Sequence, residues 1–312
     1  MENFIISINC VIPVFMMICT GALIRKIYNV PKQVFDQLST MCFQVLLPFM
    51  LFDNIYSTDL SQAFDLHLVV FLLVAIVIWF TIGYILFTLF EPDPRTRGTY
   101  IQTFYRSNIG VVGVAMARSM MDPVGVATVT IAVAVTAPLN NILAIIDLET
   151  CRGGNITFKD AVHSIVKNNI VRACALGIVF LLLDIPIPSA IQKGFGSLGD
   201  AGSALTMVAL GASLRFDGMK KNDKKLAFAT TLRLIIAPMI LNTIAILLGF
   251  RDNALGTVLL ATATPLASTA YAMALACDSD YELTAQIQVI TSFLCTFTLF
   301  LWIFSFKQLG LM

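Results

Sequence analysis

Apolar residues run along this chain in long blocks, and short polar segments separate the blocks. A helix that crosses a bilayer needs about 20 consecutive, mainly apolar residues. The blocks of this length predict ten spans: 4–24, 34–55, 67–89, 99–120, 125–147, 168–184, 189–214, 226–249, 253–276 and 284–306. The expected fold class is therefore an all-α integral membrane protein.

Composition supports this class. Hydrophobic residues make up 58% of the 312 positions and charged residues 12%, and the mean hydropathy is +0.85. Soluble domains carry about 25% charged residues, so a soluble fold of this length cannot bury so much apolar surface. The first block has no preceding basic residue and no evident cleavage site, so we expect a span there and not a signal peptide.

The polar composition gives no sign of a cofactor, a metal or a nucleic-acid partner. The net charge of +1 indicates no affinity for nucleic acid. The seven cysteines are scattered, without the paired spacing of a disulfide framework or a metal site. We expect them to serve as small core residues.

Lys and Arg are distributed unevenly between the loops. If the amino terminus lies outside, the inner loops hold most of the 20 Lys and Arg residues, including a group at 215–225. Cytoplasmic loops carry such an excess. We therefore predict a multi-pass protein of the cell (plasma) membrane with both termini extracellular. The acidic loop at 278–282 would then be cytoplasmic, but acidic residues count little in this rule.

The longest break, at about 148–167, divides the chain into two halves of five spans each. Thr157 and Asp160 form a variant of the capping box there, which predicts a short helix at the inner membrane surface. Because five is odd, the halves would have opposite orientations in the membrane. Inverted-repeat transporters are built in this way.

The ninth span is interrupted within the stretch 261–277. Pro265 removes a backbone donor and clashes with the preceding turn. Hydroxyl side chains surround it and can satisfy the freed backbone groups. An ordinary kinked helix is the alternative, since proline is common in membrane helices.

The fourth span has a corresponding weak point, because Asn108, Gly110 and Gly113 lie within six residues of one another. If the two breaks meet, four half-helix ends point at one small volume. The amino-terminal ends would attract anions there.

Five stretches together resemble the auxin efflux carrier family of the bile/arsenite/riboflavin transporter superfamily, especially its bacterial members, which include malate permeases. They extend from the second span to the ninth. The stretches are Leu-Leu-Pro-Phe-Met-Leu-Phe at 46–52, Phe-Tyr-Arg-Ser-Asn-Ile-Gly-Val-Val-Gly at 104–113, Leu-Gly-Ala-Ser-Leu at 210–214, Leu-Arg-Leu-Ile-Ile-Ala-Pro at 232–238 and Ala-Thr-Pro-Leu-Ala-Ser-Thr-Ala-Tyr-Ala-Met-Ala at 263–274.

The resemblance implies two inverted five-helix repeats, with the fourth and ninth spans crossed at the substrate site. It implies a scaffold at 1–60 and 168–217, a transport domain at 61–150 and 218–312, and a cytoplasmic connecting loop at 151–167. It also implies cofactor-free transport of a small organic anion by a protein surrounded by membrane lipid, and a homodimer formed through the scaffold.

One residue departs from the family pattern. Ala115 stands where many members carry a proline shortly after the second glycine of the fourth span. The break in that span then rests on Asn108, Gly110 and Gly113 alone. We therefore expect it to be shallower than the break at Pro265, so the site would not be strictly symmetric.

The predicted substrate site combines both breaks with nearby polar residues: Arg106, Asn108, Gly110, Gly113, Asn141, Arg233, Pro265, Ala267, Ser268 and Thr269. Asn108 either donates its amide to a carboxylate or caps the broken helix. Arg106 must face a cavity or a partner; it either binds the anion or neutralises the carbonyl end of the first half-helix. Arg233 either joins the site or snorkels to the inner surface. At most one of the adjacent amides, Asn140 and Asn141, would reach the substrate.

Three classes of function remain open. The favoured class is a secondary transporter or facilitative carrier for a small organic anion, working by alternating access. A sodium-coupled bile-acid-type symporter is its nearest alternative. A receptor or structural membrane protein would use the breaks only for packing. An intramembrane enzyme needs a nucleophile with a base, or a metal set. His67 and His163 lie at a span end and in a loop, and we place no carboxylate near a span centre, so we expect neither an enzyme nor proton coupling through Asp or Glu.

Overall fold

The computed structural model describes residues 2–57, 65–151, 167, 169–213, 222–267 and 269–312. Within these ranges the chain folds into helices and turns, without strands. The short helix predicted from Thr157 onward lies outside the described residues, and residues 148–151 of the predicted break continue the preceding helix. Ser268 also lies outside them.

The helices follow the apolar blocks along the chain. Three wider π-helical turns, labelled η, adjoin some of these helices. In chain order the elements are α1 (Glu2–Tyr28), α2 (Lys32–Met41), η1 (Cys42–Leu46), α3 (Leu47–Tyr56), α4 (Leu66–Phe90), α5 (Pro94–Tyr105), η2 (Ile109–Gly113), α6 (Val114–Met120), α7 (Pro123–Cys151), α9 (Asn169–Leu182), α10 (Ser189–Ser213), α12 (Asp223–Thr231), η3 (Leu232–Ile236), α13 (Ala237–Leu247), α14 (Asp252–Ala263), α15 (Ala270–Ala276) and α16 (Tyr281–Gln308).

Several helical segments are suited to a bilayer. Among the described residues, five are long and apolar enough to cross a membrane: Lys32–Asp53, Leu66–Phe90, Pro123–Cys151, Asp223–Leu247 and Tyr281–Gln308. The all-helical class is therefore confirmed. The arrangement of ten spans in two inverted repeats stays a prediction.

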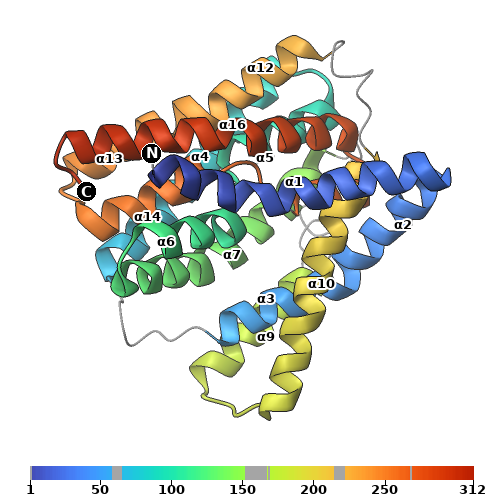
Figure 1. Cartoon of the computed structure of the whole chain (residues 1–312), viewed down its shortest axis with the longest axis horizontal. Helices are drawn as coiled ribbons and strands as arrows, with labels where there is room; N and C mark the ends of the chain where they lie inside the picture. Colours follow the sequence, from blue (N-terminus) through green and yellow to red (C-terminus); the bar gives the residue numbers. More distant parts are fainter. Residues whose placement is uncertain (1, 58–64, 152–166, 168, 214–221, 268) are drawn as a thin grey trace.

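Helix α10 is the centre of one group of helices. It packs against α1, α2 and α3, and α9 packs against α3. In Figure 1, α3, α9 and α10 extend together at the lower side of the view, whereas α12, α13 and α16 lie at the upper side. Helix α7 contacts α3 of the lower group and also contacts α14, so it lies between α3 and α14.

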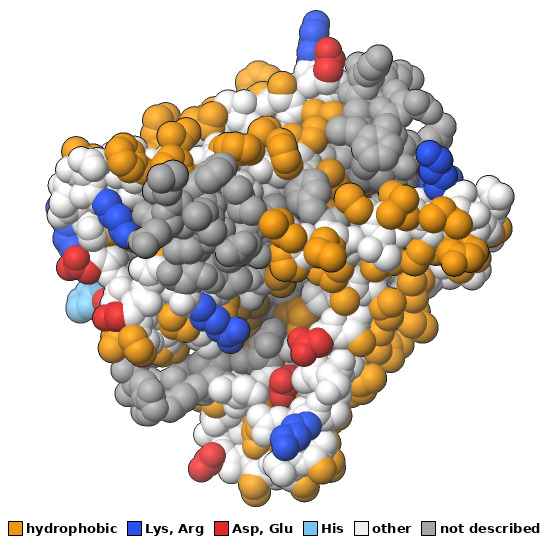
Figure 2. All heavy atoms as spheres, viewed as in Figure 1, with side chains coloured by type: hydrophobic (Ala, Val, Ile, Leu, Met, Phe, Trp, Pro, Cys, Tyr) orange, Lys and Arg blue, Asp and Glu red, His pale blue; other side chains and the backbone are white. Residues whose placement is uncertain are grey.

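The outer face of the molecule is apolar. On helix α4, a row of large apolar side chains is exposed, including Val70, Val74, Val77, Ile78 and Ile82. Figure 2 shows apolar side chains spread over the visible face, with charged ones at its edges and in its lower middle. Soluble monomers rarely expose contiguous apolar patches of this kind, which is in keeping with a lipid environment.

Two glycines allow α1 and α10 to approach closely. A Cβ atom added to Gly21 would fall on the carbonyl oxygen of Val208, and one added to Gly211 would fall on that of Ile18. Small residues permit such close backbone contacts between membrane helices. The α1–α10 contact is therefore specified at these two positions.

We expect Gly211→Ala to lower the thermal stability of the protein, because the atom that the new methyl group meets belongs to the main chain of α1. Overpacking a close contact costs about 1–3 kcal/mol. Gly194→Ala on the same helix is the matched control, since nothing lies within 4 Å of its added Cβ. Melting curves of the two purified variants provide the test, and equal melting temperatures would argue against the close approach.

Candidate functional site

Both predicted interruptions are present. Helix α5 ends at Tyr105 and η2 begins at Ile109, so residues 106–108 are not helical. Helix α14 ends at Ala263 and α15 begins at Ala270, which leaves the longer interruption at 264–269. The glycines at 110 and 113 lie within the helical turn that follows the first interruption, so they do not form the break itself.

The two interruptions meet through their main chains. The backbone N–H of Asn108 donates to the carbonyl oxygen of Pro265 at 2.9 Å. The side chain of Asn108 is buried, and it makes no capping hydrogen bond to the helix that follows. The Asn108 carbonyl oxygen accepts from the N–H groups of Val112 and Gly113, so its main chain caps this helix while its side chain does not.

The ends of the two interrupted helices are also joined. Where α6 ends and α14 begins, Asn253 Nδ2 donates to Asp122 Oδ1 at 2.8 Å. Where α5 begins and α15 ends, Arg95 Nη2 lies 2.9 Å from Asp278 Oδ2. The helices therefore run antiparallel and are held together at both ends and at their breaks.

The start of α5 is fixed by a carboxylate cap. Asp93 precedes the helix and accepts a hydrogen bond from the backbone N–H of Arg95. The Thr96 hydroxyl donates to Asp93 Oδ2 at 2.7 Å, and this hydrogen bond lowers the pKa of the Asp93 carboxyl below its usual range. A fixed start of α5 helps to fix the position of the break at its other end.

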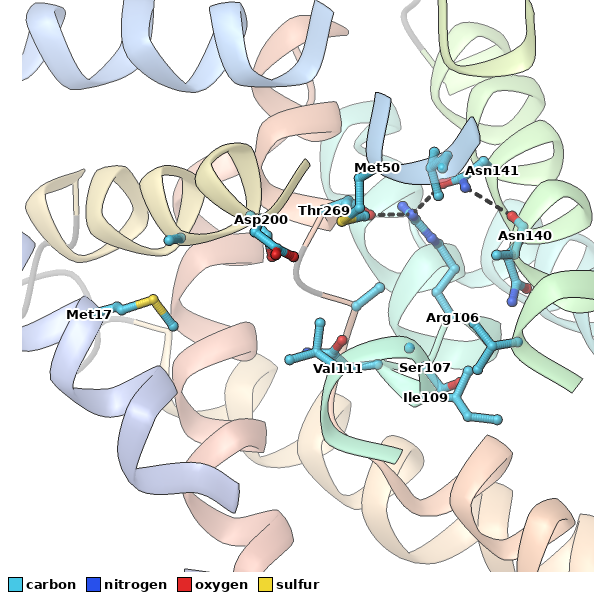
Figure 3. Close-up of a pocket in the computed structure, with 18 residues that line it drawn as sticks. Met17, Met50, Arg106, Ser107, Ile109, Val111, Asn140, Asn141, Asp200 and Thr269 are labelled. Atoms are coloured by element: carbon cyan, nitrogen blue, oxygen red, sulfur yellow. Dashed lines mark hydrogen bonds between the residues drawn. The ribbon is translucent and has the colours of Figure 1, made fainter. Parts of the chain in front are cut away.

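Arg106, in the first interruption, is the most highly connected residue of the region. Only 2% of its surface is exposed. Its Nη1 donates to Gln102 Oε1 at 2.6 Å and lies 3.1 Å from Met273 Sδ. Its Nη2 donates to Thr269 Oγ1 at 2.7 Å and to Asn141 Oδ1 at 3.1 Å. Arg106 thus links α5, α7, the second interruption and α15; Figure 3 shows its bonds to Asn141 and Thr269.

A cavity of about 370 Å³ opens beside the two interruptions (Figure 3). Cavities of this size accommodate small molecules. Six of the predicted site residues line it: Arg106, Asn108, Gly110, Asn141, Ala267 and Thr269. Gly113, Pro265 and Arg233 do not line it.

Comparisons with known proteins identify the family. The model of a family described as "membrane transport protein" matches this chain over residues 6–170 and 154–303, which together cover nearly all of it. The chain belongs to this family. The auxin efflux carrier family predicted from the sequence motifs is thereby confirmed. The chain is also similar to an uncharacterized transporter of Methanothermobacter thermautotrophicus, with 23% identity over 301 residues that cover 96% of this chain and 98% of the relative.

Members of the auxin efflux carrier family are transporters. Together with the long apolar helices, membership makes this chain a multi-pass membrane transporter. Neither the family description nor the relative's name gives a substrate, so the substrate is inferred from the residues that line the cavity.

The far wall of this transporter's cavity was missed by sequence reasoning. It comes from α10, through Asp200, Ser203 and Ala204. Asp200 lies near the middle of α10, so the expectation that no carboxylate lies near a span centre is wrong. The position of Asp200 in the sequence does indicate this role, because a charged residue within a span normally faces a cavity or a partner.

Arg233 belongs to a different part of the transporter. It is 1% exposed, so it does not snorkel to the surface, and that alternative is wrong. Its Nε donates to the carbonyl oxygen of Thr264 at 2.9 Å, directly after the end of α14. It lines a separate cavity of about 30 Å³ that shares Ser107 and Asn140 with the larger one. Arg233 therefore stabilises the carbonyl end of a half-helix, where a cation is favoured.

A second carboxylate lies inside the bundle. The predicted fifth span ended at 147, but α7 continues to Cys151 and leaves Asp147 fully buried. Its Oδ1 lies 3.6 Å from Cys151 Sγ, and its Oδ2 has no hydrogen-bond partner among the described residues. Asp147 also interacts electrostatically with Arg106. Its position at the predicted end of a span made it look interfacial.

The described residues form no group of three or more His, Cys, Asp or Glu side chains that could hold a metal ion. The polar groups around the cavity are instead amides, hydroxyls, one guanidinium and one carboxylate: Asn108, Asn140, Asn141, Ser107, Ser203, Thr269, Arg106 and Asp200. Such groups bind a polar solute through hydrogen bonds and charge.

Proposed function

We propose that this protein is a secondary transporter or facilitative carrier that moves a small organic anion with a carboxylate group by alternating access. The substrate is held where the two interrupted helices meet. The observation that carries the proposal is the cavity of about 370 Å³ that both interruptions line, with the buried cation Arg106 in its wall. A cation at membrane depth marks a substrate or ion pathway.

Several residues in and next to the interruptions would bind the substrate together. Arg106 supplies the positive charge, and its hydrogen bonds to Asn141 and Thr269 orient the guanidinium. The Asn108 amide can donate a further hydrogen bond to the carboxylate. Gly110 lies in the first turn of the helical segment that starts at Ile109, where backbone N–H groups favour an anion.

The movement would take place between two parts of the chain. We propose that residues 1–60 and 168–217 form a scaffold and homodimer interface, and that 61–150 and 218–312 form the transport domain, built as two inverted repeats. In the conformation described, helix α2 contacts the proposed transport domain through two side-chain pairs. Lys32 lies 3.3 Å from Glu282, and Asp36 lies 3.2 Å from Tyr271. These contacts would have to break when the transport domain moves.

Uptake into proteoliposomes tests the proposal. Purified protein should accumulate or exchange a radiolabelled organic acid, and empty liposomes should not. A thermal-shift screen of organic acids selects the probes, because a ligand that binds only the folded state raises its apparent stability. The sodium-coupled alternative predicts that uptake stops when choline replaces sodium. A receptor or structural protein would bind acids without any transport.

We expect both termini to be extracellular, because most Lys and Arg residues then fall in inner loops. The test is labelling of single cysteines by an impermeant reagent, in a variant that lacks the seven native cysteines. Lys224→Cys should be labelled only after the membrane is permeabilised. Gln308→Cys, at the end of α16, should be labelled on intact cells and is the control. Labelling of Lys224→Cys from outside would reverse the topology.

A further inference from the structure

The cavity has charged groups of opposite sign on opposite walls. Arg106 comes from the first interruption and Asp200 from α10, and both line the same space. Figure 3 shows Asp200 on the opposite side of the cavity from Arg106 and Asn141, with Thr269 between them in this view. A ligand in the cavity therefore meets a cation at one end and an anion at the other.

The cation is fixed in charge and in position. A guanidinium stays protonated in proteins. Hydrogen bonds of 2.6 Å to Gln102 and 2.7 Å to Thr269 hold its two terminal nitrogens. Its Nε atom is buried and has no hydrogen-bond partner among the described residues. Asn140, whose side-chain oxygen is also buried without a described partner, lines the cavity close by.

The anion on the opposite wall is exposed, and no cation of the described part of the chain lies beside it. No Lys, Arg or His nitrogen of a described residue forms an ion pair with Asp200. Asp53 of α3 lies near it but does not line the cavity. Asp200 makes this wall negative, so it attracts a cationic group of a ligand and repels an anionic one.

These charges separate the possible classes of carboxylate. A dicarboxylate would bring its second negative charge toward Asp200. A simple monocarboxylate would satisfy Arg106 but leave Asp200 without a cation. An α-amino acid carries a carboxylate for Arg106 and an ammonium for Asp200. Most of the remaining wall is apolar, formed by Met17, Met50, Leu51, Ile109, Val111 and Val133, and suits an apolar side chain.

We infer that the substrate is a zwitterion, an α-amino acid with an apolar side chain, whose ammonium group is selected by Asp200. The inference rests on the proposed function, since it keeps the carrier and the carboxylate site at Arg106. It differs in the net charge of the substrate, because an ammonium group balances the carboxylate. It adds Asp200 of α10 as a specificity-determining residue opposite Arg106.

Compounds matched on one carbon skeleton test this inference on the purified full-length protein. L-Leucine carries both charged groups, 4-methylpentanoate lacks the amine and 3-methylbutylamine lacks the carboxylate. L-Phenylalanine, 3-phenylpropanoate and 2-phenylethylamine form a second series, and succinate represents the dicarboxylates. The dependence of the melting temperature on ligand concentration yields an apparent Kd for each compound.

In the wild type, each amino acid should bind more tightly than its deaminated partner, by up to about fivefold, the scale of one partly exposed ion pair. Asp200→Asn should remove most of this preference, mainly by weakening the amino acids. The matched control is Asp184→Asn, which removes a carboxylate from the exposed turn between α9 and α10, outside the cavity. It should leave the preference unchanged. Asn tolerates the positive φ of 50° at residue 184.

The outcomes separate the two proposals. If 4-methylpentanoate or succinate binds as tightly as leucine, and Asp200→Asn changes neither, the zwitterion inference is overturned while the organic-anion carrier stands. If no carboxylate in the panel binds, both are overturned. The wild-type series is decisive even where a variant is poorly folded.

Discussion

Replacing Arg106 by glutamine should weaken carboxylate binding by roughly five- to 150-fold, which corresponds to the loss of about 1–3 kcal/mol from a charge-assisted hydrogen bond. Arg106→Lys should recover part of the affinity, because the charge returns while the planar fork of donors does not. Apparent Kd values from ligand-dependent melting provide the measurement. Arg118→Gln, an exposed arginine of α6 that does not line the cavity, is the control.

Folding must be separated from binding at this position. Arg106 is buried and donates hydrogen bonds to Gln102, Asn141 and Thr269. Leaving a buried acceptor without its donor costs about 1–3 kcal/mol. Arg106→Gln should therefore melt at a lower temperature than the wild type, so the effect of ligand is compared with its own ligand-free melting temperature. Wild-type affinity in folded Arg106→Gln protein would exclude Arg106 from the site.

Pro265→Ala should reduce the transport rate at least about tenfold, the effect of raising a barrier by about 1.4 kcal/mol. Proline disfavours helical geometry in the residue before it, and Thr264 is accordingly extended, with φ −71° and ψ 157°. Alanine restores a backbone N–H and allows α14 to continue toward α15. The break would then shorten, and the carbonyl of residue 265 would turn away from Asn108.

The melting temperature and expression of Pro265→Ala should change much less than its transport rate. Pro13→Ala is the matched control, because Pro13 lies inside the continuous helix α1 and has an exposed side chain. Both variants should be compared by initial uptake into proteoliposomes at equal protein content. A Pro265→Ala protein that transports at the wild-type rate would contradict the role of the break.

The sequence was sufficient to locate the helices and their interruptions, because both depend on local properties. Apolar length marks a span, and Pro265 blocks a helix wherever it occurs. The pairing of the breaks was reached from their matching positions and from the family motifs. The structure supports this pairing with the hydrogen bond between Asn108 and Pro265.

The opposite wall of the cavity could not be located in the same way. Asp200 faces the cavity because α10 packs beside α1 and α3, and single-sequence patterns carry no information on that packing. Arg233 was assigned to the same site as Arg106 because both are arginines within spans. In the structure its Nε donates to the carbonyl oxygen of Thr264 instead. Tertiary contacts determine whether such an arginine binds substrate or stabilises a helix end.

The bond between the N–H of residue 108 and the carbonyl of residue 265 consists of main-chain atoms only. Every amino acid except proline supplies the donor, and every amino acid supplies the acceptor. Mutational drift can therefore alter the side chains around the cavity, and with them the cargo, without removing this junction. The same junction is therefore compatible with cavities that bind different substrates.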